Sequence, residues 1–159
     1  MKEIKKKILF VSTIVVLSVL LDQVTKILAY TQKDKIGDGI KIFDFFNIVY
    51  VENRGISFGI FSNLDASFYL GILSFIISGY IIYVIKLTKE FWEILGLSLI
   101  LGGALGNGLD RVINNYVIDF LDFYYNKFHW PAFNFADSFI TVGGIWYFWI
   151  IFFKKNEEN

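Results

Sequence analysis

Residues 66–85 read ASFYLGILSFIISGYIIYVI, and this one stretch decides the fold class. It carries no charged side chain and is bounded by Asp65 and Lys86. Its length falls within the about 17–25 apolar residues that an α-helix needs to cross a bilayer. The stretch therefore predicts a transmembrane helix, around which the rest of the chain has to be arranged.

Three further uncharged runs occupy residues 8–21, 94–109 and 138–153. Each is shorter than a full span, so each must carry flanking polar residues into the membrane boundary. The first follows three lysines, as in a signal peptide, but no small-residue cleavage site comes after it. We therefore expect a permanent anchor that continues to about Tyr30. The four expected spans cover about 8–30, 66–85, 92–109 and 137–153.

Composition supports a helical membrane bundle and excludes several other classes of protein. The 159 residues are 55% hydrophobic and 19% aromatic, and the formal net charge is zero, so no basic excess points to nucleic acid. The absence of cysteine excludes disulfides, thiol catalysis, thiolate metal sites and palmitoylation. His129 is the only histidine. We expect a single domain, acting as a monomer, with no metal and no cofactor.

Lysine placement predicts how the chain is oriented in the membrane. Lysines cluster before the first span, between the second and third spans, and after the fourth span. With four spans these clusters share one side, which the positive-inside rule assigns to the cytoplasm. Both termini are then cytoplasmic, and segments 31–65 and 110–137 lie outside. The clustered lysines are Lys2, Lys5, Lys6, Lys7, Lys86, Lys89, Lys154 and Lys155.

The two outer segments have the composition of folded structure. Ile40–Val51 is rich in β-branched and aromatic residues, which predicts strands and a small sheet on the membrane surface. Asn114–Tyr116 predicts a turn, and Val117–Phe120 resembles a strand. Phe120–Phe133 is aromatic, as is typical of a segment in the membrane interface.

Three aspartates are predicted to lie at one depth in the membrane. Asp22, Asp110 and Asp137 each stand roughly 22–26 Å above the inner boundary if the helix rise is 1.5 Å per residue. Lys26 lies one turn beyond Asp22 and can pair with it, and Asn107 lies one turn before Asp110. Ionisable groups at this depth are costly unless they face the bundle interior or a wet cavity. The layer therefore predicts a functional site.

A simpler interpretation of these residues remains open at this point. Asp110 and Asp137 can be helix-end residues in the headgroup region, and Asp22–Lys26 can be a structural ion pair. The glycines of the third span also have a structural explanation, because small residues let helices pack closely. These are Gly102, Gly103, Gly106 and Gly108.

Without cysteine, and with one histidine, aspartates are the natural acid–base groups. Two carboxylates at one site share a proton, so that one takes a proton from water while the other polarises the scissile carbonyl. Asp119 and Asp137 make the best pair, because Val117–Phe120 can lie over the start of the fourth span. Asp122 is a weaker candidate, because it begins the more aromatic, interfacial segment.

Five motifs along the chain resemble those of one family, the lipoprotein signal peptidases (signal peptidase II, or prolipoprotein signal peptidases). The resemblance covers nearly the whole chain, and the five occur in the right order at the right spans. They are Asp22-Gln-Val-Thr-Lys26, Asn53-Arg-Gly-Ile-Ser-Phe58, Gly102-Gly-Ala-Leu-Gly-Asn-Gly-Leu-Asp-Arg111, Val117-Ile-Asp-Phe120 and Phe133-Asn-Phe-Ala-Asp137.

This resemblance implies a fold and an activity. The fold is membrane all-α, with four transmembrane helices, a small extracytoplasmic β-sheet and an interfacial segment. The activity is that of an aspartic endopeptidase in the bacterial cytoplasmic membrane, with its active site near the outer face. Such an enzyme removes the signal peptide from diacylglyceryl-modified prolipoproteins and cuts before the lipidated cysteine. It is also the target of the antibiotic globomycin. The implied partners are this substrate and membrane lipid.

The resemblance also implies roles for individual residues. Asp119 and Asp137 match the catalytic aspartates. Eight more match residues that bind substrate or support the pair: Asp22, Lys26, Asn53, Gly55, Asn107, Asp110, Arg111 and Asn134. One departure is visible, because Asn114-Asn115 stands in a turn where many members of the family have glycine. Asparagine tolerates the left-handed backbone that such a turn requires.

Two other functions compete with the peptidase. A transporter or proton relay would use Asp22, Lys26, Asp110 and Asp137 as a path, but the inner halves of the spans carry no ionisable residue at a matching depth. Nothing in the composition excludes a non-catalytic adaptor with a folded outer cap. A binding role alone does not explain why costly carboxylates gather in one layer.

Overall fold

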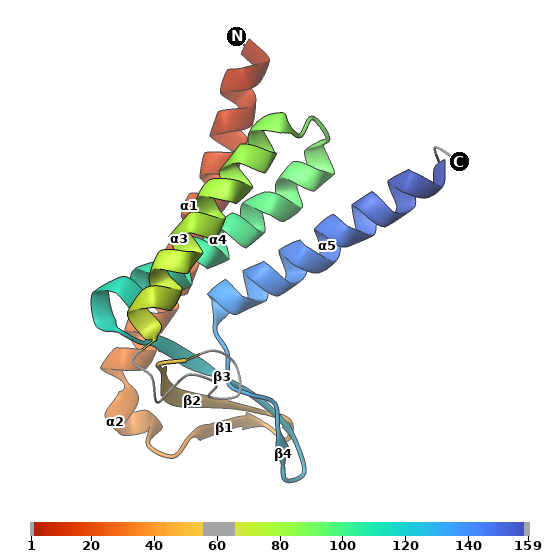
Figure 1. Ribbon diagram of the computed structural model, residues 1–159. Helices are drawn as coiled ribbons and strands as arrows, with labels where there is room; N and C mark the ends of the chain where they lie inside the picture. Colours follow the sequence, from red (N-terminus) through yellow and green to blue (C-terminus); the bar gives the residue numbers. More distant parts are fainter. Residues whose placement is uncertain (1, 56–65, 158–159) are drawn as a thin grey trace.

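The computed structural model describes residues 2–55 and 66–157 and has nine elements (Figure 1). Four of its helices are long and apolar enough to cross a membrane, which confirms the four predicted spans. The elements are α1 (Lys2–Thr31), α2 (Lys33–Ile36), β1 (Ile40–Phe43), β2 (Phe46–Asn53), α3 (Ser67–Leu87), α4 (Phe91–Asn114), β3 (Val117–Tyr125), β4 (Phe128–His129) and α5 (Phe135–Glu157).

The third long helix continues further than the sequence indicated. The third span was expected to cover about residues 92–109, but α4 runs on through Asp110 and Arg111 to Asn114. It ends where Asn115 adopts a left-handed backbone (φ 61°) and its N–H reaches the carbonyl of Arg111 at 3.1 Å. The predicted turn at Asn114–Tyr116 is therefore confirmed. Because Asp110 and Arg111 are consecutive in a helix, their side chains point in different directions.

A small antiparallel sheet covers one end of the helices (Figure 1). Its strand order is β1-β2-β3-β4. β2 pairs with β3 so that Asn53 lies opposite Val117 and Val51 lies opposite Asp119. The strands predicted in 40–51 and 117–120 are thus confirmed. Much of the aromatic segment 120–133 belongs to β3 and β4, and Phe123 packs there against Phe46 and Phe133. Its place in the membrane interface stays a prediction.

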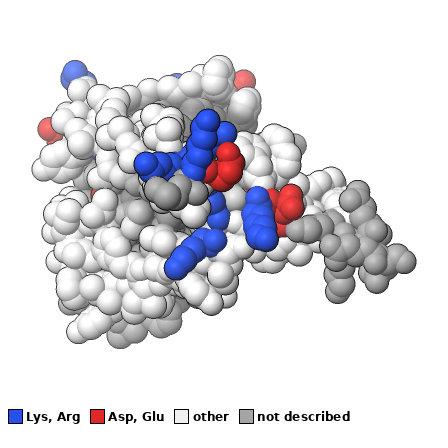
Figure 2. All heavy atoms as spheres, turned by 90° about the horizontal axis from the view of Figure 1, so that it is seen from above, with Lys and Arg blue, Asp and Glu red and all other residues white. Residues whose placement is uncertain are grey.

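The opposite end of the molecule is basic. Figure 2 views this end, and blue spheres of basic residues gather on it; the basic residues here are lysines. The Lys7 ammonium donates hydrogen bonds to the carbonyls of Lys86 (3.2 Å) and Thr88 (2.5 Å). The lysine cluster of α1 and that of the α3–α4 link therefore lie side by side, as four membrane crossings require.

Close packing around α4 depends on glycine. α4 contacts α1, α3 and α5. A Cβ atom at Gly103 would overlap the carbonyl oxygen of Ala136, and one at Gly102 would come within 2.6 Å of the Ser18 Cβ. A Cβ at Gly106 would come within 2.7 Å of the Asp22 carboxylate. The predicted packing role of these glycines is confirmed, and it lets polar groups of three helices meet.

We predict that Gly103→Ala destabilises the protein by about 1–3 kcal/mol, because the added methyl group overpacks the α4–α5 contact. The matched control is Gly79→Ala in α3, where a Cβ meets no atom within 4 Å. Thermal unfolding in detergent measures both variants. Equal melting temperatures for the two would contradict the packing assigned to Gly103.

Candidate active site

A buried lysine is the centre of the polar network. The Lys26 ammonium donates to Asp22 at 2.7 Å, to Asp110 at 2.6 Å and to the Asn107 side-chain oxygen at 2.8 Å. Only 2% of Lys26 is exposed, and Asp22 is fully buried. All three ammonium protons therefore have an acceptor. The predicted Asp22–Lys26 pair is confirmed, and Asp110 joins it.

One ammonium group neutralises only one of the two carboxylates, and further hydrogen-bond donors stabilise the remaining negative charge. The backbone N–H of Ala136, at the start of α5, donates to Asp22 at 2.9 Å. The Gln23 amide donates to Asp110 at 3.1 Å and to Asp22 at 3.2 Å. Sequence reasoning missed Gln23, although a glutamine beside Asp22 in an apolar helix was a usable signal. These bonds tie α1, α4 and α5 together at one level.

Asn107 links the lysine to the first candidate catalytic aspartate. Its amide nitrogen donates to the Asp137 carboxylate at 2.7 Å. Because an ammonium group can only donate, the Asn107 oxygen must face Lys26 and its NH₂ group must face Asp137. Lys26 thus determines which way the amide points.

Asp137 is oriented by a reciprocal cap at the start of α5. The Asp137 backbone N–H donates to the Asn134 side-chain oxygen at 2.9 Å, and the Asn134 backbone N–H donates back to the Asp137 carboxylate at 3.2 Å. This is the geometry of a capping box, with Asn134 as N-cap and Asp137 three residues later. Asn-x-x-Asp is the sequence signal for it. The positive end of the helix dipole also favours a carboxylate at this position.

Asp119, on strand β3, also contacts Asn134. It accepts a hydrogen bond from the Asn134 amide at 2.7 Å and another from the Asn53 amide at 2.9 Å. Asn134 therefore contacts both aspartates of the predicted pair. Burial, with the Asp137 charge second, raises the pKa of Asp119 to about 7, although the two amides and Lys26 oppose that rise. At neutral pH Asp119 carries a proton for much of the time.

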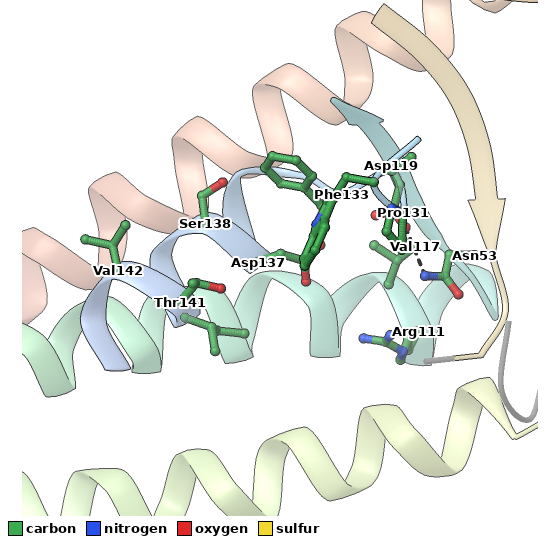
Figure 3. A pocket seen from close by; sticks show the side chains of 13 residues that line it. Asn53, Arg111, Val117, Asp119, Pro131, Phe133, Asp137, Ser138, Thr141 and Val142 are labelled. Atoms are coloured by element: carbon green, nitrogen blue, oxygen red, sulfur yellow. Dashed lines mark hydrogen bonds between the residues drawn. The ribbon is translucent and has the colours of Figure 1, made fainter. Parts of the chain in front are cut away.

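Both aspartates open into one cavity of about 580 Å³ (Figure 3). Asp119 is 3% exposed, whereas Asp137 is only partly buried. The segment Trp130–Phe133 forms one wall, and the first turns of α5 form another. Sequence reasoning did not anticipate this wall, because it depends on how the β3–β4 hairpin returns to α5.

Arg111 lies at the edge of the cavity. Its Nη2 donates to the carbonyl of Gly55 at 3.1 Å, while its buried Nε has no hydrogen-bond partner. The Gly55 N–H donates to the Asn53 side-chain oxygen at 3.0 Å, so a short turn brings Asn53 to Asp119. Ile56–Phe58, the end of the Asn53 motif, and Asp65 lie outside the described residues.

The structure places the rival candidate, Asp122, away from the cavity. It accepts hydrogen bonds from the Asn47 amide at 2.9 Å and from the His129 ring at 2.9 Å. It lies three positions after Asp119, and side chains at odd spacing point to opposite faces of a strand. Asp122 contacts His129 across the β3–β4 hairpin, and only Asp119 lines the cavity together with Asp137.

The site brings together all ten residues predicted for it. Asp22, Lys26, Asn107 and Asp110 form its base, and the remaining six surround or line the cavity. In the described ranges, no cluster of three or more His, Asp and Glu residues is arranged to hold a metal ion. The carboxylates are held by ammonium, amide and backbone N–H groups instead.

Comparison with known proteins places this arrangement in context. The family model described as signal peptidase (SPase) II matches residues 14–153. A lipoprotein signal peptidase of Thermodesulfovibrio yellowstonii is 46% identical over 128 residues, covering 80% of this chain and 84% of the relative. One from Alteromonas mediterranea is 39% identical over 152 residues, covering 90% and 82%.

Two solved structures share the fold. Each is described as a bacterial membrane enzyme. The first superposes with a TM-score of 0.84 at 31% identity and covers 94% of this chain and 92% of its own. The second has a TM-score of 0.74 at 34% identity and covers 89% and 92%.

We predict that a protonated carboxyl band in the infrared spectrum disappears with a midpoint near pH 7 as Asp119 ionises. Asp119→Asn should remove this band. Asp137→Asn should move the midpoint to lower pH, because the Asp137 charge is one cause of the raised pKa. Loss of the Asp119-dependent band near pH 4 in the unaltered protein would contradict this environment.

Proposed function

This chain belongs to the signal peptidase (SPase) II family, and we propose that it processes prolipoproteins as an aspartic endopeptidase. Its family comprises lipoprotein signal peptidases, which remove the signal peptide just before the lipidated cysteine. The chain is a multi-pass membrane enzyme. The observation that carries the aspartic mechanism is that Asp119 and Asp137 line one cavity and share Asn134 as a hydrogen-bond partner.

In the proposed mechanism the aspartates hold one proton between them. Asp137, at the positive end of α5, is the ionised member and removes a proton from the attacking water. Asp119 holds the proton and gives it to the oxygen of the scissile carbonyl. The tetrahedral intermediate then collapses: the C–N bond breaks, the amine of the lipidated cysteine takes a proton from Asp137, and Asp119 recovers its own. The signal peptide leaves with a new carboxyl group, which then loses its proton to water.

The neighbouring residues are proposed to hold this pair and the substrate backbone. Asn107 and Asn134 orient the two carboxylates through the bonds described above. Asn53 and Arg111 lie at the cavity edge, where amide and guanidinium N–H groups suit substrate carbonyls. The Nε of Arg111 is the one buried side-chain donor of the lining without a partner among the described residues. Lys26, Asp22 and Asp110 support the pair from below and do not line the cavity.

We further propose that the active site lies near the outer face and that both termini are cytoplasmic. The lysines of α1 and of the α3–α4 link lie at one end of the bundle, and the sheet lies at the other (Figure 1). The cavity is lined by residues of β2, β3 and the start of α5, at the sheet end. The positive-inside rule assigns the lysine end to the cytoplasm. A lipidated substrate would then approach from the surrounding membrane lipid. A monomer suffices, because this one chain supplies both aspartates.

We predict that Asp119→Asn and Asp137→Asn each lower the cleavage rate by about 10³-fold or more, because each removes one half of the acid–base pair. The assay mixes detergent-purified protein with a diacylglyceryl-modified prolipoprotein and follows the gel shift on signal-peptide loss. Asp122→Asn is the matched control, since it is the same change on the same strand outside the cavity. Near-normal cleavage by a folded Asp119→Asn or Asp137→Asn variant would refute the mechanism.

The absence of cysteine makes the orientation directly testable. A single cysteine introduced by Lys127→Cys should react with a membrane-impermeant maleimide in intact spheroplasts. One introduced by Lys5→Cys should react only after the membrane is permeabilised. The reverse pattern would overturn the proposed orientation.

A further inference from the structure

A second hollow lies at the lysine end of the molecule, away from the catalytic aspartates. Its volume is about 510 Å³, and it is formed by the start of α1, the α3–α4 link and the start of α4. Figure 2 views this end, where the basic spheres gather. The hollow is lined by Glu3, Ile4, Lys6, Lys7, Phe10, Lys86, Leu87, Thr88, Lys89, Phe91 and Ile94.

Lysines from two helices and the link converge on this hollow. Lys6 and Lys7 come from α1, Lys86 from the last turn of α3, and Lys89 from the link. Glu3 is the only acidic residue in the lining, and it lies 3.1 Å from Lys6. The lining therefore keeps a clear excess of positive charge. Its side chains belong to segments that Lys7 joins through the carbonyls of Lys86 and Thr88.

Apart from Thr88, the rest of the lining is apolar. Phe10 and Phe91 contact each other with ring centroids 4.8 Å apart, and Ile94 of the same lining is buried. A free anion would gain nothing from such a surface. A molecule with a negative head and a hydrocarbon tail matches both halves of the hollow at once, because cations bind the head and apolar side chains contact the tail.

We propose that this hollow binds an anionic phospholipid, with its phosphate among Lys7, Lys86 and Lys89 and an acyl chain against Phe10 and Phe91. The site is separate from the one that cleaves the prolipoprotein. It ties the start of α1 to the α3–α4 link through the lipid headgroup. Lysine clusters beside membrane helices are the usual partners of anionic headgroups, and each lysine strengthens the attraction.

Native mass spectrometry of the full chain in detergent tests this proposal. Phosphatidylglycerol should bind more tightly than phosphatidylcholine with the same acyl chains. The double variant Lys86→Gln/Lys89→Gln should bind phosphatidylglycerol with an affinity on the order of tenfold lower. The matched control, Lys35→Gln/Lys127→Gln, removes the same charge from the sheet end and should bind as the unaltered protein does. Melting temperatures without lipid confirm that both variants are folded.

Three results would overturn the proposal. One is equal binding of the two lipids, and another is an equal loss of binding in the control variant. The third is displacement of phosphatidylglycerol by inorganic phosphate at the same concentration, which would show a plain anion site. None of these outcomes depends on cleavage, so the proposal stands or falls separately from the peptidase mechanism.

Discussion

The ion pair of Lys26 with two buried carboxylates is the interaction on which the rest of this structure depends. Taking an ammonium and two carboxylates out of water costs several kcal/mol per ion unless each is paired and hydrogen-bonded. Here Lys26 meets Asp22 and Asp110 at 2.7 and 2.6 Å, and Gln23 and the Ala136 N–H complete the set. The cluster can form only where three helices come close, which is why glycines line α4 at that level.

The geometry of the proposed catalytic pair follows from this cluster in two steps. Lys26 orients the Asn107 amide, and Asn107 in turn contacts Asp137. Asn134 then caps α5, contacts Asp137 and reaches Asp119 on the sheet. A buried, hydrogen-bonded cluster of this kind can hold two carboxylates at the edge of an open cavity, where water and a substrate reach them.

Much of this was predictable from the sequence, because spans and charges obey simple rules of length and depth. The four helices, the strands of 40–51, the Asp22–Lys26 pair and the packing role of Gly103 follow from local pattern alone. Contacts across long separations do not. Asp119 and Asp122 lie on opposite faces of β3, and the pairing of β3 with β2 decides which of these faces turns toward the cavity. α4 continues past Asp110 and ends only where Asn115 adopts a left-handed backbone. The Asn114-Asn115 pair predicts a turn but does not show that the helix continues up to it.

The most direct test measures the unfolding free energy of Lys26→Met in detergent. It should fall by about 3–5 kcal/mol, because two carboxylates are left buried and unpaired. Adding Asp22→Asn and Asp110→Asn to the same variant should restore most of that loss, since the neutral amides need no counter-ion. A Lys26→Met protein as stable as the unaltered chain would contradict the central place given to this ion pair.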